Sequence, residues 1–327
     1  MRLKSFIITI VALFVLANVI VAAMRRCGVV PDAASAPDDV HPVAAGASPT
    51  PPLETPLTPE SAAAVLSSAP LSTVARPPAG IEGLHLQLSR PLMFDIGALG
   101  GLAAEGEHLY VAAWDDGAGA AVLYQVDRAS YGITQVRALA EEGTISVGGI
   151  DVGGGLVWVP LTRGGDSAGT LLVGVDARTL EVRERREAAR DIAAVAAGGD
   201  GSLYGVTRDG ALWLVWPSDD GPAREAAAVG GARYTDLAEA GGSLVAVGTD
   251  GVSGVVDVID PQGFTLLARH HGVAEGADGA WVTSGGLEVT DEAVLLLPEG
   301  GARPSLLTYV PEAGDLDAFA PSVEVGK

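Results

Sequence analysis

A short pattern of strand, glycine turn and strand recurs along this chain and constrains its fold more than any other feature. Its clearest copy is Gly148-Gly149-Ile150-Asp151-Val152-Gly153-Gly154-Gly155-Leu156-Val157-Trp158-Val159-Pro160. Four further copies are centred on Leu102, Val195, Leu237 and Leu287, so that consecutive central positions lie 48, 45, 42 and 50 residues apart. A period of about 40 to 50 residues with four strands in each unit is typical of a β-propeller.

The second unit shows how each repeat is expected to build one four-stranded blade. The pattern above supplies its first two strands, Leu171 to Asp176 the third and Leu180 to Arg185 the fourth. Charges alternate along this last segment, as expected for the outer edge of a blade. We therefore predict an all-β propeller of five blades, in which Leu84 to Arg90 completes the last blade and closes the ring. A sixth, degenerate blade within residues 270–284 is the alternative.

The first 26 residues are predicted to be a signal-anchor or a signal peptide. Ile7 to Met24 is an apolar run interrupted only by Thr9 and Asn18. Eighteen helical residues span roughly 27 Å, close to the thickness of the bilayer hydrocarbon. The length favours an uncleaved helix through residues 7–24 that anchors the protein in the cell membrane. Cleavage after Val21-Ala22-Ala23 is the alternative, and it would give a secreted or periplasmic protein.

Residues 27–80 are predicted to be a disordered linker, followed by the propeller domain at residues 81–327. The linker contains 11 of the chain's 20 prolines and is otherwise rich in alanine and serine. Such a composition offers little apolar surface to bury. The linker contains no Lys or Arg from residue 27 to residue 75, which favours export of the domain that follows.

The charge balance excludes some classes of partner. Acidic residues outnumber basic ones by 41 to 20, which gives a formal net charge of −21. A nucleic-acid interface needs clustered Lys or Arg, so no nucleic-acid partner is expected. Cys27 is the only cysteine, so neither an intramolecular disulfide nor a cysteine-rich metal site can form.

Three segments carry a resemblance to a known family. They are GGIDVGGGLVWVPL with the following TLLVGVDARTLEV, then SLYGVTRDGALWLVW, and finally LEVTDEAVLLLPEGGARPSLLTYV. Over about residues 95–312 the chain resembles a family of uncharacterised bacterial extracytoplasmic β-propeller proteins, catalogued as a domain of unknown function. The resemblance implies the propeller fold and no activity. Members tend to carry a His-Pro-Gln-Gly turn and an Asp-His pair, where this chain has Ala98-Leu99-Gly100-Gly101 and Asp191-Ile192-Ala193.

Motifs for known chemistries are sparse. The chain has no G-x-S-x-G, H-E-x-x-H or Walker loop. His270-His271 is the only histidine cluster, and adjacent residues of a strand point to opposite faces. Gly198-Gly199-Asp200-Gly201 lacks the spaced carboxylates of an EF-hand loop and is interpreted as a hairpin turn. No catalytic residue is therefore assigned.

One constellation of charged residues is predicted at a mouth of the central channel. In a propeller, the ends of the second strands and the starts of the first strands lie on the same face. The charged residues at these places are candidates for a ligand site: Asp115, Asp116, Arg163, Asp191, Arg208, Asp209, Asp236 and Asp250.

Two hypotheses for the function follow. The first is a membrane-tethered, extracytoplasmic binding or scaffold propeller that takes a small-molecule or protein ligand at one face. The second is an extracytoplasmic hydrolase or lyase that uses the carboxylates at the channel mouth. No cofactor is evident. Calcium is the cation expected if the carboxylates converge, because hard oxygen ligands suit it.

Overall fold

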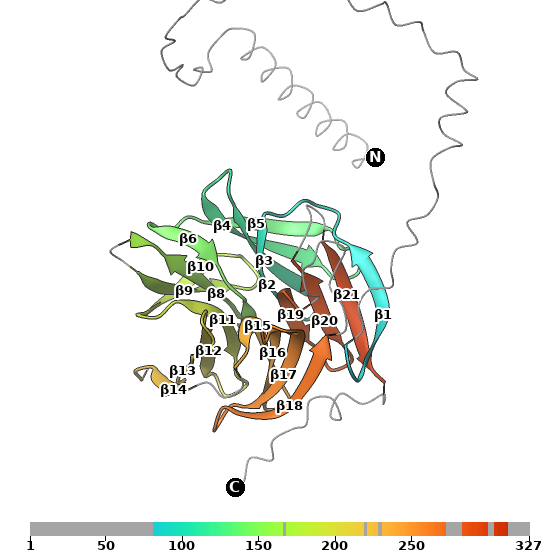
Figure 1. Cartoon of the computed structure of the whole chain (residues 1–327). Coiled ribbons are helices and arrows are strands. Elements are labelled where there is room, and N and C mark those ends of the chain that lie inside the picture. The colour runs from blue at the N-terminus through green and yellow to red at the C-terminus, as the bar shows by residue number, and fades with distance from the viewer. Residues whose placement is uncertain are drawn as a thin grey trace, which may run out of the picture. The chain divides into compact units, whose positions relative to one another are not determined.

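The computed structural model describes residues 81–165, 168–218, 221–227, 231–272, 283–299 and 304–312. These residues form five sheets, which stand as blades around a common axis (Figure 1). The prediction of an all-β propeller with five blades is confirmed, and the described residues form no sixth sheet.

Three of the blades are regular, with four antiparallel strands from the axis outward. Blade I consists of β2 (Ala98–Glu105), β3 (His108–Asp115), β4 (Ala120–Asp127) and β5 (Ile133–Leu139). Blade III consists of β11 (Ile192–Ala197), β12 (Leu203–Thr207), β13 (Leu212–Trp216) and β14 (Arg224–Ala227). Blade IV consists of β15 (Arg233–Ala240), β16 (Ser243–Thr249), β17 (Gly254–Asp260) and β18 (Thr265–Gly272).

Blade II differs because its inner strand is split. The blade consists of β6 (Thr144–Val147), β7 (Asp151–Gly153), β8 (Leu156–Arg163), β9 (Gly169–Asp176) and β10 (Val182–Ala188). Pro160 of β8 has no amide hydrogen to continue the ladder at the interruption. Gly148 donates to the oxygen of Pro160 at 3.0 Å, whereas Gly149 donates to Ala193 of blade III at 2.8 Å. The inner strand therefore leaves its own blade at the residues that open the recurring pattern, where the sequence predicts one continuous strand.

Blade V is completed by the first strand of the domain. It consists of β19 (Gly285–Val289), β20 (Val294–Pro298), β21 (Ser305–Pro311) and β1 (Leu84–Pro91), with β1 outermost. β1 pairs antiparallel with β21, from Leu84 opposite Pro311 to Pro91 opposite Ser305. This confirms the prediction that the strand beginning at Leu84 closes the ring.

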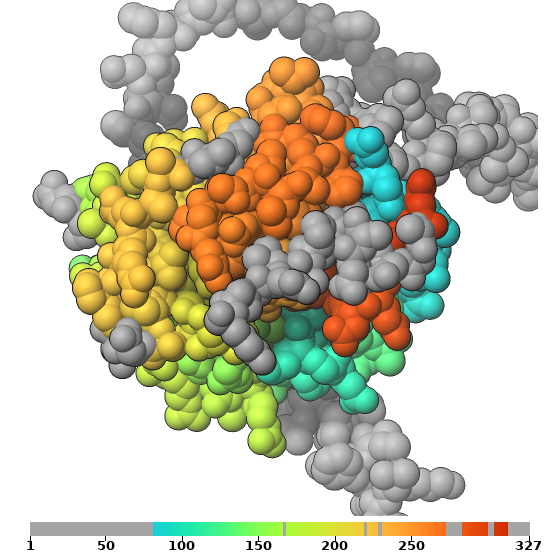
Figure 2. Space-filling view, turned by 90° about the horizontal axis from the view of Figure 1, so that it is seen from below, coloured from blue at the N-terminus to red at the C-terminus, as the bar shows by residue number. Residues whose placement is uncertain are grey.

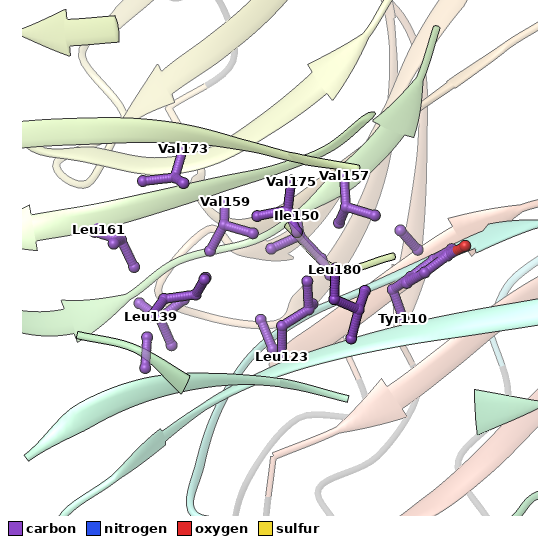
Figure 3. Packing of buried hydrophobic residues seen from close by; sticks show 14 of the residues in the cluster. Tyr110, Leu123, Leu139, Ile150, Val157, Val159, Leu161, Val173, Val175 and Leu180 are labelled. Carbon is purple, nitrogen blue, oxygen red and sulfur yellow. The ribbon is translucent and has the colours of Figure 1, made fainter. Parts of the chain in front are cut away.

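The core consists of five buried apolar clusters in the described residues, one at each interface between neighbouring blades. Between blades I and II, Leu123 of β4 and Val159 of β8 lie in one such cluster (Figure 3). Trp158, the neighbour of Val159 in β8, instead belongs to the cluster between blades II and III. Because both faces of a blade are buried, its central strands are apolar throughout rather than alternating.

The turns define two faces of the propeller. Strands of one blade are antiparallel, so successive turns lie at opposite ends of the blade. We call the end with the turns between second and third strands the mouth face. The turns between first and second strands, and between third and fourth strands, lie on the opposite face.

The predicted anchor at residues 7–24 and the linker at residues 27–80 lie outside the described residues. Within the described part of the chain, no helix is long or apolar enough to cross a membrane.

Candidate functional site

One position of the repeat lies on the propeller axis. It directly precedes the central apolar residue of each copy, and its occupants in blades I to V are Gly101, Gly149, Ala194, Asp236 and Gly286. Only blade IV places a charged side chain there, and the relative exposure of Asp236 is 0%. The pairing register of β15 with β16 shifts directly before Asp236, as it does at the same place in blades I and III. Asp236 therefore lies inside the ring, and not at the mouth where the sequence places it.

Backbone amides from three blades hold the carboxylate of Asp236. Its Oδ2 accepts hydrogen bonds from Leu102 N of blade I at 3.0 Å and from Leu287 N of blade V at 2.8 Å. Its Oδ1 accepts one from Leu237 N at 3.0 Å. A Cβ atom on Gly149 of blade II would collide with Oδ1. The carboxylate thus fills the space between the inner strands, and small neighbours are needed to admit it.

Two more buried carboxylates also accept hydrogen bonds from backbone amides of two blades. They lie two residues after the axial position of their own repeats. Asp151 of β7 and Glu288 of β19 are 5% and 6% exposed. Each accepts the amide hydrogen of the next residue and one from the inner strand of the following blade: Val152 and Ala197 for Asp151, Val289 and Ala104 for Glu288. We call Asp151, Asp236 and Glu288 the axial carboxylates. They connect inner strands of different blades.

Burial shifts the protonation of all three axial carboxylates. It raises the pKa of Asp236 and of Glu288 well above the usual values, and the nearby charge of Asp151 raises both further. Burial also raises the pKa of Asp151 to about 7, against the opposing effect of the amides that it accepts. The folded protein therefore retains protons here that free carboxyl groups would release.

At the mouth face, the structure brings three of the predicted site residues together. Arg208 Nε lies 3.0 Å from Asp191 Oδ2, and Arg208 Nη2 donates to Thr162 Oγ1 at 3.0 Å. The Thr162 hydroxyl donates to Asp191 Oδ1 at 3.1 Å. Asp191, Arg208 and Asp209 line a pocket of about 460 Å³. Two of its charges, Asp191 and Arg208, therefore neutralise each other.

Asp209, the third of these residues, is engaged by its own turn. Its Oδ1 accepts hydrogen bonds from Thr207 Oγ1 at 2.6 Å and from Ala211 N at 3.0 Å. The Thr207 hydroxyl, followed by the Ala211 amide, lowers the pKa of Asp209 below its usual value. Asp209 is therefore ionised at neutral pH.

The other predicted mouth residues lie in separate turns. Asp115 accepts the amide hydrogens of Gly117 and Ala118 at 2.8 and 3.1 Å, and Asp116 is exposed in the same turn. Asp250 accepts from Ser253 N at 2.7 Å and Val252 N at 2.9 Å, which lowers its pKa. Arg163 forms an ion pair with Glu187 of β10 at 3.1 Å.

The arrangement of side chains at the mouth face does not add support for the predicted calcium site. Among the described residues, no group of three or more His, Cys, Asp or Glu side chains is arranged to hold a metal ion. The calcium site expected from the sequence stays a prediction.

A larger cleft lies on the opposite face, between blades III and IV. Its volume is about 910 Å³. The surfaces of these two blades lie directly against each other, in yellow and orange in Figure 2. The turn at 198–202 of blade III and the turn at 260–264 of blade IV form parts of its wall. Gly198 accepts from Gly201 N at 2.9 Å and donates to Ser202 O at 2.8 Å, which confirms the predicted hairpin turn.

Two aromatic residues, Tyr204 and Phe264, line this cleft, and we call them its aromatic floor. Phe264 is buried to 5% exposure and stacks on Trp213, with ring centroids 5.3 Å apart and an interplanar angle of 13°. Tyr204 approaches the Phe264 ring edge-on at 6.5 Å. Phe264 adopts a left-handed φ of 49°, as Tyr131 and Leu180 do in the corresponding turns of blades I and II.

The rim of the cleft is acidic. Four carboxylates and one guanidinium line it: Asp200, Glu225, Glu239, Asp260 and Arg224. Glu239 Oε1 accepts from Gly242 N at 2.7 Å, and Asp260 Oδ1 accepts from Gln262 N at 2.9 Å. These bonds fix the carboxylates in turns at the edge of an aromatic floor.

Comparison with solved structures supports the fold. The chain is similar to glutaminyl cyclase from Myxococcus xanthus, with a TM-score of 0.54 and 13% identity over 72% of this chain and 99% of that one. It is also similar to the PQQ-bound aldose sugar dehydrogenase from Streptomyces coelicolor, with a TM-score of 0.49 and 14% identity over 72% of this chain and 100% of that one. A protein of unknown function from Bacteroides caccae gives a TM-score of 0.43 and 11% identity over 66% of this chain and 78% of that one.

These neighbours are β-propeller proteins, and at such low identity the likeness concerns the fold alone. No family model matches the chain, and no curated protein matches its sequence. The resemblance to an uncharacterised extracytoplasmic family stays a prediction.

Proposed function

We propose that this chain is a binding propeller without catalytic activity, and that its ligand site is the cleft between blades III and IV. The observation that carries the proposal is the cleft itself. Its volume of about 910 Å³ falls within the range of small-molecule sites, roughly 300–1,000 Å³. An apolar floor with a few fixed polar groups at the rim is the usual composition of such sites.

The chemistry of the mouth face favours binding over catalysis. A general acid or base works best when its pKa lies near the working pH. The pKa values of Asp209 and Asp250 are lowered instead, and Asp191 is paired with Arg208. Asp151 has a pKa of about 7 and Asp236 a raised one, but both side chains are buried in the ring and do not lie at the mouth. A hydrolase or lyase at the mouth is the second candidate, and it requires these contacts to rearrange.

A neutral aromatic probe tests the ligand site. We expect 2-phenylethanol to bind the full chain with a Kd on the order of 1 mM, as a ligand of this size typically does. Ala226 lines the cleft, so Ala226→Phe should fill it and abolish the saturation-transfer NMR signal of the probe. Ala138→Phe on the exposed outer strand of blade I is the matched control and should leave the signal unchanged. An equal signal in wild type and Ala226→Phe would reject the cleft as the ligand site.

The proposal includes a tether that places the propeller outside the cytoplasm. It is motivated by the apolar run Ile7 to Met24 and the proline-rich segment that follows it. We expect the full chain to remain in the membrane fraction after a carbonate wash. A chain that lacks residues 1–26 should appear in the soluble fraction. Full-length protein in the soluble cytoplasm would contradict the tether.

A further inference from the structure

The cleft between blades III and IV also indicates which chemical class of ligand it takes. We propose that it selects a small organic cation with an apolar or aromatic body. This inference rests on the proposed function, because it concerns the same cleft. It goes further by assigning the charge of the ligand, which the volume of the cleft leaves open.

The charges around the cleft do not cancel. Glu225 is neutralised by Arg190, whose Nε and Nη2 lie 3.1 Å from its two carboxylate oxygens. Asp200, Glu239 and Asp260 then face a single guanidinium, that of Arg224, among the described lining residues. The local excess of negative charge attracts a cation and repels an anion over about 10 Å at ordinary salt.

The carboxylates at the rim of the cleft influence the Tyr204 side chain electrostatically. Burial is the main reason why the pKa of the Tyr204 phenol is raised, and the charges of Asp200 and Glu239 raise it further. The negative field of these two carboxylates therefore reaches the ring that a ligand would contact. An ammonium group there is stabilised by the carboxylates and lies beside the Tyr204 and Phe264 side chains that line the cleft.

Apolar surface completes the match with an amphipathic cation. Val215 and Ala226 line the cleft beside Tyr204 and Phe264. A hydrated inorganic ion gains nothing from such a floor, whereas the aromatic or aliphatic body of an organic cation buries its own apolar surface against it. The composition therefore favours an organic cation over a metal ion.

Three probes that share one ring but differ in charge test the inference. Phenethylammonium is the cation, 2-phenylethanol is neutral and phenylacetate is the anion. We expect the cation to bind the full chain about tenfold more tightly than the anion, with the alcohol between them, in calorimetry at low salt. Raising the ionic strength to about 1 M should bring the affinities for cation and anion together.

Two carboxylate variants locate the effect. Glu239→Gln keeps the oxygen that accepts from Gly242 N and removes the charge, so it should weaken phenethylammonium about threefold and leave 2-phenylethanol unchanged. Asp250→Asn removes the same charge from the same blade on the mouth face, and it should change neither affinity. Thermal melting of both variants checks that the fold is retained.

The outcomes separate the two proposals. Equal affinity for all three probes, with loss of binding in Ala226→Phe, would overturn the charge selection and keep the cleft as a binding site. Tighter binding of phenylacetate would also overturn the charge selection, because Arg224 would then dominate the rim. Binding of the cation that persists in Ala226→Phe would overturn both proposals.

Discussion

Replacing Asp236 with alanine is expected to lower the free energy of unfolding by about 4 kcal/mol. The substitution leaves the amide hydrogens of Leu102, Leu237 and Leu287 without their acceptor in the interior of the ring. A buried donor that loses its partner costs about 1–3 kcal/mol. The total stability of a domain is about 5–15 kcal/mol, so the loss is a large share of it. Urea unfolding monitored by circular dichroism measures it.

The asparagine variant refines this expectation. An amide oxygen at the place of Oδ2 still accepts from Leu102 and Leu287, whereas the amino group faces the Leu237 amide in place of an acceptor. Asp236→Asn should therefore lose about 2 kcal/mol, less than Asp236→Ala. Asp291→Ala, in the exposed turn between β19 and β20, is the control and should stay within about 0.5 kcal/mol of wild type. If Asp236→Ala lowers the free energy of unfolding by less than about 1 kcal/mol, water must accept the three amide hydrogens in place of the carboxylate.

The blade count and ring closure could be predicted because they follow from local patterns. The strand–turn–strand copies define the blades. Leu84 to Arg90 alternates apolar and polar residues and lies outside these copies, so it remains to close the last blade. The split inner strand of blade II could not be predicted in the same way. It arises because Gly149 bonds to Ala193 of the next blade, a contact between residues of different repeats.

The position of Asp236 carried a signal that local reasoning missed. By strand position alone, Asp236 is an acid at the entrance of a strand, like its neighbours at the mouth. Aligned by repeat, it replaces Gly101, Gly149, Ala194 and Gly286, which are all small. A single large residue among small ones on the axis of a ring fills the space that the others leave. Its three amide partners also come from three different blades, which a pattern of alternating residues does not reveal.

The cleft between blades III and IV could not be found from the sequence. Its lining comes from turns and strands of two blades, and strand patterns do not report the spacing between blades. Phe264 was not singled out, because its role depends on a left-handed backbone and on the stack with Trp213. The strand ends place Asp191, Arg208 and Asp209 on one face, but the ion pair between Asp191 and Arg208 depends on side-chain direction, which strand patterns do not give.

Stability should fall as the pH rises from about 4.5 to 7, and Asp151 alone should contribute about 3 kcal/mol of the loss. An acid whose pKa is raised by folding keeps its proton in the folded state at a pH where the unfolded chain has released it. Its contribution is complete below the unfolded pKa of about 4 and is lost as the pH rises through the folded value, about 7 for Asp151. Asp236 and Glu288 act in the same direction. Urea midpoints at several pH values measure the slope.

The opposite slope is expected below about pH 4, because turn carboxylates such as Asp209 and Asp250 have lowered pKa values and lose their contribution on protonation. Maximum stability should therefore lie near pH 4 to 5, lower than in most proteins. Asp151→Asn removes one of the three axial carboxyl groups and should make the slope above pH 4.5 less steep by about 1.4 kcal/mol per pH unit, even though it lowers stability overall. Glu292→Gln removes one exposed charge and should keep the slope, which separates the axial carboxylates from repulsion among the many surface acids. A slope that is unchanged in Asp151→Asn would show that Asp151 does not retain its proton in the folded protein between pH 4.5 and 7.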